Sequence, residues 1–232
     1  MFIKIDPVLF EKQNDYVIGV VVAEGVDNSS ENKEIEELLS TVIDQQKEAL
    51  QGQIVKNLKE FEPYHVAMRN FGISVSRFLP SIEALLTRLA KTGNLPSISP
   101  VVNLTNVISL QHHVPIGTHD MDSLVGDLEI RQVKSDDVFE GGEESSGFDN
   151  GEVVYASGNS IRTRRWIWRQ MPVGLTTKDT KNLVFPVDGF SGNVETILAA
   201  RDALASALQR YFGCKINVGL IKKESPFFKI TD

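Results

Sequence analysis

The chain of 232 residues contains a single cysteine, Cys214, so it can form no internal disulfide and offers no cysteine cluster for a metal. No stretch approaches the roughly 20 apolar residues that span a bilayer. The first residues also lack the basic segment and long apolar core of a secretory signal. We therefore expect a cytoplasmic protein that makes no contact with membranes.

Positive charge is scarce, because 24 Lys and Arg residues face 31 Asp and Glu residues, giving a formal net charge of −7. Non-specific binding to nucleic acid depends on a positive field that displaces phosphate counterions. We expect no DNA binding, and any RNA binding has to come from a local basic patch. The apolar fraction of 41% and the charged fraction of 24% are typical of a globular domain with a substantial core.

The order of the predicted elements indicates an α+β fold. Residues 16–23 form a continuous run rich in β-branched side chains, as in a buried strand. Residues 193–212 place apolar side chains on one stripe of a helix, and residues 215–221 read as a closing strand. Asn28 and Glu31 have the spacing of a capping box, which predicts that a helix begins there. Strands and helices do not alternate regularly, which argues against a βαβ series.

The segment from Ser99 to Asp120 interleaves polar side chains with Val, Ile and Leu. A buried amide or hydroxyl without a partner costs roughly 1–3 kcal/mol, so such side chains tend to line a pocket. Thr105 and Asn106 could orient a ligand or a water there, or they could cap and cross-link the fold. The polar side chains of the segment are Asn103, Thr105, Asn106, His112, His113, His119 and Asp120.

The three histidines and Asp120 are ligand types that zinc accepts. Adjacent histidines on a helix diverge by about 100°, however, so His112 and His113 cannot easily share one ion. No Glu or Cys at ligand spacing completes a tetrahedral set with His119. The sequence therefore predicts no metal site and no cofactor.

Four arginines and two tryptophans stand close together in residues 161–170. As one continuous strand, this segment would place Arg162, Arg164, Trp166 and Trp168 on the same face. Arginine beside tryptophan suits phosphate contact and base stacking, so Arg164, Trp166, Trp168 and Arg169 are candidates for RNA binding. The alternative is structural: arginine stems pack over the indole faces and pair with acidic side chains.

The polar segment resembles the B3/B4 editing domain of the bacterial phenylalanyl-tRNA synthetase beta subunit. That family has a stretch Val-Val-Asp-Val-Thr-Asn-Tyr-Val followed by Gln-Pro-Leu-His-Ala-Phe-Asp. The Arg-Trp-x-Trp-Arg core resembles free-standing relatives of the domain, as do residues 80–86 and 95–98. The residues that match the first two stretches are Val101, Val102, Thr105, Asn106, Val107, Pro115 and Asp120.

The resemblance implies one B3/B4-like domain over residues 1–232, with a mixed and antiparallel, sandwich-like sheet core covered by helices. Residues from about 1 to 95 would pack on a core formed by residues 96–232. It also implies a helix over residues 101–111, which the β-branched content alone would not predict.

The resemblance further implies a substrate pocket lined by Asn103, Gly117, Asp120 and Phe185, with Thr105 and Asn106 orienting a water or ligand. Gly117 stands where the family has a histidine. Phe185 aligns with a glutamate that is associated with reading the phenolic hydroxyl of tyrosine. Because an aromatic wall cannot discriminate a hydroxyl as a hydrogen-bonding group does, the protein should not be a tyrosine-specific editor.

These implications lead to a free-standing protein that binds tRNA or aminoacyl-tRNA and hydrolyses the mischarged ester in trans. Backbone N–H groups near the Pro115–Gly117 bend would steady the developing oxyanion. The alternative is a non-catalytic module that binds RNA or a small amino-acid-like ligand. A third hypothesis is a structural protein with a vestigial pocket.

Overall fold

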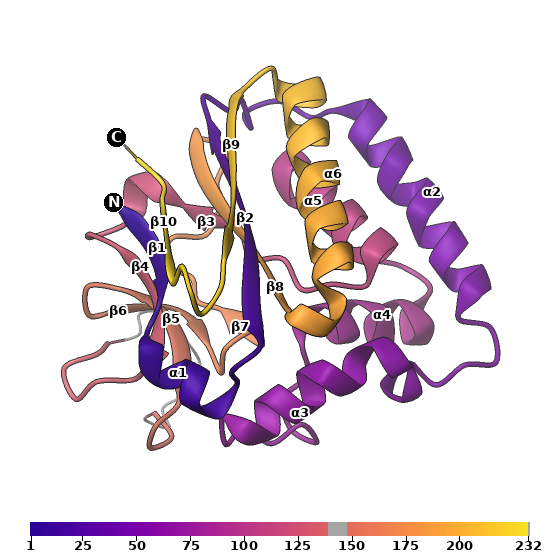
Figure 1. Cartoon of the computed structure of the whole chain (residues 1–232). Helices are drawn as coiled ribbons and strands as arrows, with labels where there is room; N and C mark the ends of the chain where they lie inside the picture. The colour runs from indigo at the N-terminus through magenta and orange to yellow at the C-terminus, as the bar shows by residue number, and fades with distance from the viewer. Residues whose placement is uncertain (139–147, 232) are drawn as a thin grey trace.

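Two β-sheets lie against each other, and helices cover the outer face of one of them (Figure 1). The computed structural model describes residues 1–138 and 148–231. It confirms an α+β domain with a sandwich-like core. The larger sheet has the order β10 (Phe227–Lys229), β1 (Phe2–Ile5), β4 (Leu128–Gln132), β5 (Val153–Ser157), β6 (Ser160–Arg164) and β7 (Arg169–Gln170). The smaller sheet has the order β3 (His119–Asp120), β8 (Asn182–Phe190), β2 (Tyr16–Glu24) and β9 (Lys215–Ile221).

Strand β2 lies at the centre of the smaller sheet, antiparallel to both β8 and β9. Its residues from Tyr16 to Ala23 are all buried, which confirms the buried strand that the β-branched run predicts. Among the residues that the structure describes, the other side of β8 is paired only with the two residues of β3 and with the short segment Pro115–Gly117. This incompletely covered side of β8 borders the candidate site.

The helices are layered on the smaller sheet. Helices α5 and α6 pack together, α6 contacts β2, β8 and β9, and α2 packs against α5 (Figure 1). The helices predicted over residues 101–111 and 193–212 are confirmed. The helix bounds are α1 (Pro7–Lys12), α2 (Lys33–Ala49), α3 (Glu62–Asn70), α4 (Ser81–Thr92), α5 (Pro100–His112) and α6 (Val194–Phe212). Short 3-10 turns are η1 (Val55–Asn57), η2 (Lys59–Phe61), η3 (Met121–Ser123) and η4 (Ser191–Asn193).

The start of α2 differs from the prediction. Asn32 is the N-cap, and its side chain accepts a hydrogen bond from the Ile35 N–H at 3.2 Å. Asn28 instead accepts from the N–H of Val101 at 3.1 Å and donates to the carbonyl of Thr177 at 2.8 Å. The capping box at Asn28 was wrong because this side chain ties two distant segments together.

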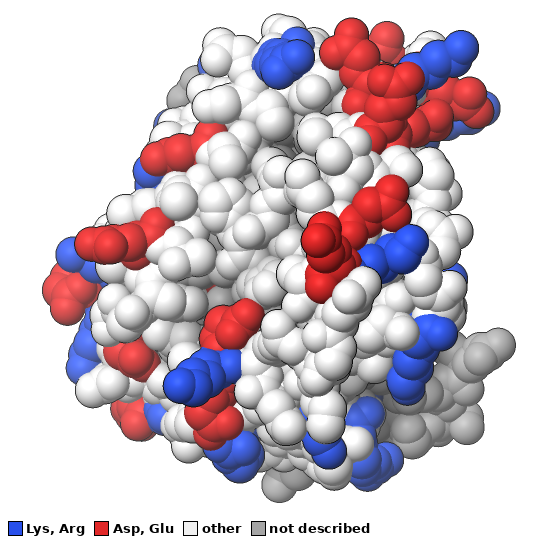
Figure 2. Space-filling model, turned by 90° about the vertical axis from the view of Figure 1, so that its right-hand side faces the viewer, with Lys and Arg blue, Asp and Glu red and all other residues white. Residues whose placement is uncertain are grey.

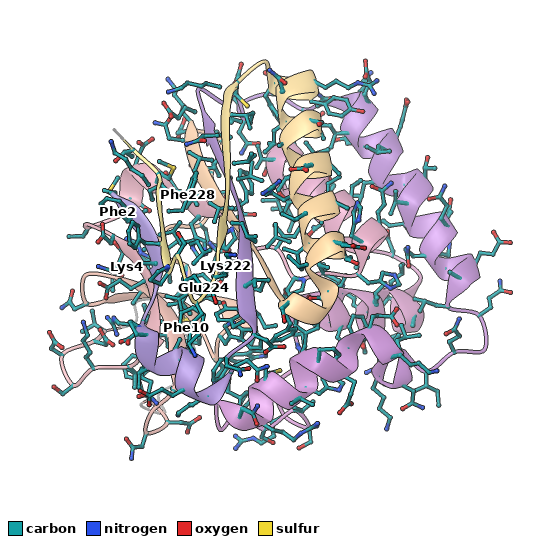
Figure 3. The ribbon with its side chains drawn as sticks, viewed as in Figure 1. Phe2, Lys4, Phe10, Lys222, Glu224 and Phe228 are labelled. Atoms are coloured by element: carbon teal, nitrogen blue, oxygen red, sulfur yellow. The ribbon has the colours of Figure 1, made fainter. Side chains whose placement is uncertain are left out.

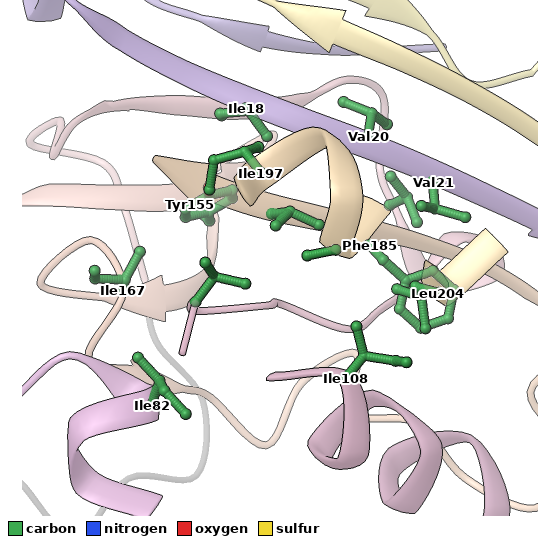
Figure 4. Packing of buried hydrophobic residues seen from close by; sticks show 14 of the residues in the cluster. Ile18, Val20, Val21, Ile82, Ile108, Tyr155, Ile167, Phe185, Ile197 and Leu204 are labelled. Carbon is green, nitrogen blue, oxygen red and sulfur yellow. The ribbon is translucent and has the colours of Figure 1, made fainter. Parts of the chain in front are cut away.

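Glycine allows α6 to approach the smaller sheet closely. A Cβ built on Gly189 of β8 would lie 2.3 Å from the side chain of Ile197, and one on Gly19 of β2 would lie 3.1 Å from it. The first distance is too short for any Cβ unless the packing shifts, and the second is tighter than ordinary packing. Figure 4 shows Ile197, Leu204 and Phe185 in the resulting core between the helices and the sheet.

The two ends of the described chain meet at one edge of the larger sheet. Strand β1 pairs antiparallel with β10, and the rings of Phe2 and Phe227 lie 5.7 Å apart at 90°. Lys4, which lies near Phe2 on β1 (Figure 3), forms an ion pair of 2.8 Å with Asp127. Phe228 packs over Gly219 of β9, where any Cβ would lie 2.3 Å from its ring. The last strand therefore braces both sheets.

The surface carries mixed charge. Figure 2 shows the face with α2, where acidic side chains gather toward the top and basic ones lie mostly lower. Among the residues that the structure describes, no helix is both long and apolar enough to cross a membrane.

Candidate functional site

A cavity of about 90 Å³ lies beside the incompletely covered side of β8. The Pro115–Gly117 segment, the end of β6 and the start of α4 also border it. Exposed Arg169 and half-buried Trp168 and Gln170 form part of its lining, so the cavity reaches the surface there. Its walls combine apolar side chains with a few buried polar groups. The lining residues are Ser81, Pro115, Ile116, Gly117, His119, Tyr155, Thr163, Trp166, Ile167, Trp168, Arg169, Gln170, Pro186 and Asp188.

The chain does not run as one strand through residues 161–170. Strand β6 ends at Arg164, and Arg165 and Trp166 both adopt left-handed backbone conformations, with φ of 48° and 62°. Two consecutive non-glycine residues with positive φ are uncommon and need support from their surroundings. The N–H of Trp166 donates to the Val153 carbonyl at 2.6 Å, which provides part of that support. The predicted strand was therefore wrong in its second half.

Glu152 provides the remaining support for this turn. Its carboxylate accepts two hydrogen bonds from the Arg164 guanidinium, at 2.9 and 2.8 Å, and a third from the Arg165 backbone N–H at 3.1 Å. Both charged side chains are about 99% buried. A bidentate pair of this kind is both strong and directional. It holds the backbone in the conformation that turns Trp166 inward.

Burial removes two of the four predicted RNA-binding side chains from the surface. Trp166 is completely buried and its ring lies 5.5 Å from that of Tyr16, while Arg164 is committed to Glu152. Neither side chain is exposed on the surface, so the structure gives no support to a direct contact of either with a nucleic acid. Arg165 lies over the rings of Phe78 and Trp168, at 3.8 and 4.8 Å. The structural alternative, arginine stems packed on aromatic faces and paired with acids, therefore describes most of this segment.

Asp188 lies at the centre of a buried hydrogen-bond network that joins the two sheets. Its Oδ1 accepts a hydrogen bond from Tyr16 of β2 and another, of 2.5 Å, from Tyr155 of β5. The indole N–H of Trp166 donates to the Tyr16 oxygen at 2.9 Å, and the Tyr64 hydroxyl donates to the Asp188 carbonyl at 2.9 Å. Asp188 is 2% exposed, and its side chain lines the cavity.

Burial raises the pKa of Asp188 to about 6, although the hydroxyls of Tyr155 and Tyr16 and the nearby indole of Trp166 favour the ionised form. The pKa values of Tyr16 and Tyr155 are raised in turn, chiefly by burial and then by the charge of Asp188. At neutral pH the cavity wall therefore contains one buried carboxylate held by two neutral phenols.

Gly117 and His119 also line the cavity, next to β8, and they depend on each other. A Cβ on Gly117 would lie 2.9 Å from Cγ of Pro186 and 3.1 Å from Nε2 of His119. The absence of a side chain at position 117 therefore leaves the space into which the His119 imidazole reaches. The N–H of Gly117 donates to the Pro186 carbonyl at 2.9 Å, so it cannot serve an oxyanion as we expected.

The His119 side chain is 98% buried and stacks on Tyr155, with ring centroids 5.5 Å apart. Its Nδ1 is buried without a hydrogen-bond partner among the described residues. Burial, and secondarily the charge of Arg162, lowers the pKa of His119 to about 3. The ring is therefore neutral at physiological pH and presents an unsatisfied nitrogen.

Helix α5 keeps Asn103, Thr105 and Asn106 away from this cavity's lining. The Thr105 hydroxyl donates to the Val101 carbonyl one turn earlier at 2.8 Å. Asn103 accepts from the Ile98 N–H at 2.9 Å and donates to Ser97 at 2.8 Å. Asn106 is half-buried on the same helix. For Asn103 and Thr105 the capping and cross-linking alternative matches the contacts that the structure describes.

The other predicted pocket residues also separate. Phe185 is completely buried on the face of β8 opposite Pro186 and Asp188, so it packs in the helix-side core and not in the cavity. Asp120 accepts from Thr180 at 3.0 Å and from the Asp122 N–H at 3.0 Å. Gly117 alone of the predicted pocket set lines the cavity.

The remaining histidines do not gather around His119. His113 contacts Glu60 at 2.7 Å and Gln46 at 2.9 Å, and half-buried His112 is its neighbour at the end of α5. Within the described residues, no three His, Cys, Asp or Glu side chains are arranged to hold a metal ion.

Comparison with known proteins identifies the family of this chain. A profile of the B3/4 domain matches residues 63–216, which is more than half of the chain. The chain belongs to the B3/4 domain family. This B3/4 domain also matches the solved structure of an N-terminal fragment of the phenylalanyl-tRNA synthetase beta subunit from Pyrococcus horikoshii, at 14% identity and a TM-score of 0.44. The match covers 91% of this chain and 49% of that fragment, so the chain spans about half its length. No curated protein matches the chain.

Sequence reasoning missed Asp188 and underrated His119. Asp188 is a lone acid inside the apolar run of β8, and a buried acid in such a run is rare unless it is paired or functional. That signal was present in the sequence. Its partners Tyr16 and Tyr155 lie 172 and 33 residues away along the chain, so only the fold identifies them.

Proposed function

We propose that the cavity receives the aminoacyl group of a mischarged tRNA and that the protein hydrolyses the ester in trans. The observation that carries the proposal is His119: a neutral, buried imidazole with an unsatisfied nitrogen, facing a cavity that Gly117 keeps open. An unpaired polar group of this kind is costly unless a ligand or water satisfies it. Membership in the B3/4 family, together with the resemblance to an editing domain, suggests an aminoacyl ester as that ligand.

The size of the cavity favours a small aminoacyl group. Its volume is about 90 Å³. Cavities that hold a benzene ring measure about 150 Å³. Ile116, Ile167 and Pro186 provide apolar contacts for a short aliphatic side chain. We therefore propose esters of small amino acids as substrates and not those of tyrosine or phenylalanine.

The reaction we propose is hydrolysis. Water attacks the ester carbonyl carbon, the bond from that carbon to the ribose oxygen breaks, and a proton from the water passes to the departing oxygen. With a pKa of about 3, His119 is a poor proton acceptor, and its proposed role is to orient the water through a ring nitrogen. The neighbouring ribose hydroxyl of the substrate would carry the proton to the leaving oxygen.

The rim of the cavity would hold the end of the tRNA. Arg169 is exposed, and its guanidinium lies 5.5 Å from the ring of half-buried Trp168. Both side chains line the cavity, so a base could stack on Trp168 while Arg169 contacts a phosphate. These two residues retain the RNA-binding role that we predicted for four.

The test is deacylation of a panel of mischarged tRNAs, including alanyl, seryl and glycyl esters, with tyrosyl-tRNA as the large counterpart. We expect release of the small amino acids above the background rate, and at least a tenfold loss in His119→Phe. Asp179→Asn in an exposed loop is the matched control. Background rates for every ester, with folded protein in excess, would refute hydrolysis.

A second candidate is a non-catalytic module that binds a small amino-acid-like ligand. The engagement of the Gly117 N–H by Pro186 favours it, because one expected oxyanion donor is thereby lost. Under this hypothesis a non-hydrolysable aminoacyl amide binds, while the corresponding ester is not turned over. Measuring both with the same protein distinguishes the two functions.

A further inference from the structure

The two carboxylate oxygens of Asp188 are not equivalent. Both tyrosine hydroxyls donate to Oδ1, and the hydrogen bonds of the described residues place no donor on Oδ2, although the Trp166 indole lies close enough to favour the ionised carboxylate. The nearby indole N–H of Trp166 is committed to the Tyr16 oxygen. A buried carboxylate ordinarily has partners on both oxygens, because each can accept two hydrogen bonds. Asp188 therefore presents an unfilled acceptor in the wall of the cavity.

The surroundings of this acceptor favour a cation. Among the described lining residues, Asp188 and Arg169 are the only Asp, Glu, Lys or Arg side chains, and Arg169 is at the exposed rim. His119, another lining residue, is neutral, so it does not repel a positive group. Its unpartnered Nδ1 is a second buried polar atom that the protein leaves unsatisfied.

We propose that Oδ2 of Asp188 binds the free α-ammonium group of the ligand, so that the cavity accepts amino acids and aminoacyl groups but rejects their N-acylated forms. This inference rests on the proposed function for the location of the ligand. It adds the chemical group that the site reads. An N-acyl group removes the positive charge of the amine and adds bulk beside the Asp188 carboxylate. Because Tyr16 and Tyr155 hold that carboxylate in place, it cannot move aside to make space.

The experiment measures binding, which does not require turnover. The probes are 3′-alanylamido-3′-deoxyadenosine, a non-hydrolysable amide, and the same compound with an N-acetyl group. Isothermal titration with the full chain at pH 7.5 should give at least tenfold weaker binding of the acetylated probe. In Asp188→Asn, which keeps the shape and removes the charge, the free-amine probe should lose that advantage. Asp179→Asn should retain it.

The comparison of the two probes on the unaltered protein needs no variant, so the inference stays testable if Asp188→Asn does not fold. Equal affinity for both probes, or binding of neither, overturns it. Discrimination between the probes without hydrolysis of any ester leaves the inference standing and refutes the deacylase. Equal hydrolysis of alanyl-tRNA and N-acetylalanyl-tRNA would support the deacylase and refute the inference that Asp188 binds the ammonium group.

Discussion

The hydroxyl of Tyr155 donates a 2.5 Å hydrogen bond to Oδ1 of Asp188 and so links the two sheets beside the cavity. Hydrogen bonds to charged groups contribute about 1.5–3 kcal/mol to stability. We expect Tyr155→Phe to lower the free energy of unfolding by about 2 kcal/mol in urea denaturation at pH 7.5. Tyr211 of α6 is half-buried, so Tyr211→Phe is the control and should change the free energy of unfolding little. A Tyr155→Phe protein as stable as the parent would show that this bond is not formed in solution.

The inferred amine site predicts a pH dependence. The pKa of Asp188 is raised to about 6 by burial, so the carboxylate loses its charge as the pH falls through 6. Binding of the free-amine probe should weaken between pH 7.5 and 5, while binding of the acetylated probe stays constant. His119 does not change its charge between pH 7.5 and 5, because its pKa is about 3. Parallel pH profiles for the two probes would contradict the role of Asp188.

Filling the space at position 117 should close the cavity. The Cβ in Gly117→Ala would meet Pro186 at 2.9 Å and His119 at 3.1 Å. Overpacking of this kind typically costs about 1–3 kcal/mol. We expect a comparable loss of stability together with loss of probe binding. Gly192→Ala is the matched control, because nothing lies within 4 Å of its Cβ position. Unchanged probe binding in Gly117→Ala would place the ligand elsewhere.

Neutral His119 should make the fold sensitive to acid. Its pKa falls from 6.5 to about 3 on folding, so between these values the unfolded chain binds a proton that the folded chain excludes. Stability is therefore lost as the pH falls below 6.5, by about 3 kcal/mol at pH 4.5 from this group. His119→Gln should lose correspondingly less stability between pH 7.5 and 4.5 in urea titrations. The same loss in both proteins would mean that His119 becomes protonated in the folded state.

Glu152 should be critical to the turn that buries Trp166. Removing one partner of a buried ion pair typically costs about 3–5 kcal/mol. In Glu152→Gln the Arg164 guanidinium loses the charged acceptor of two hydrogen bonds. We expect Glu152→Gln to destabilise the protein by about 3 kcal/mol and to shift Trp166 fluorescence toward that of an exposed indole. The exposed pair Asp44–Lys47 supplies the control, and Asp44→Asn should cost under about 1 kcal/mol. Similar effects of both substitutions would remove Glu152 from this role.

Elements whose stability depends on local pattern could be predicted from the sequence. Strand β2 and helix α6 differ from the predicted bounds by one residue, because continuous burial defines the first and an apolar stripe the second. Strand β9 has the predicted bounds, although most of its residues are exposed or half-buried. The helix α5 is rich in β-branched residues, and only the family resemblance indicated it. The resemblance also identified the family and the bend at Gly117.

Features that depend on distant partners could not be predicted. Alternation along residues 161–170 assumes an extended backbone, and the hydrogen bonds from Arg164 and Arg165 to Glu152 override that assumption. Asn28 has the spacing of a cap, yet its partners are Val101 and Thr177. Phe185 was placed in the pocket by alignment, whereas the pleat of β8 directs Pro186 and Asp188 there instead.

The position of β2 at the centre of the smaller sheet has a consequence for biosynthesis. Its pairing partners β8 and β9 begin at residues 182 and 215, so both leave the ribosome long after β2 itself. A strand made of apolar residues from Tyr16 to Ala23 must wait with its backbone unpaired until residues 182–221 have been made. Newly made chains should thus be most prone to aggregate, and most in need of a chaperone, until residues 182–221 emerge.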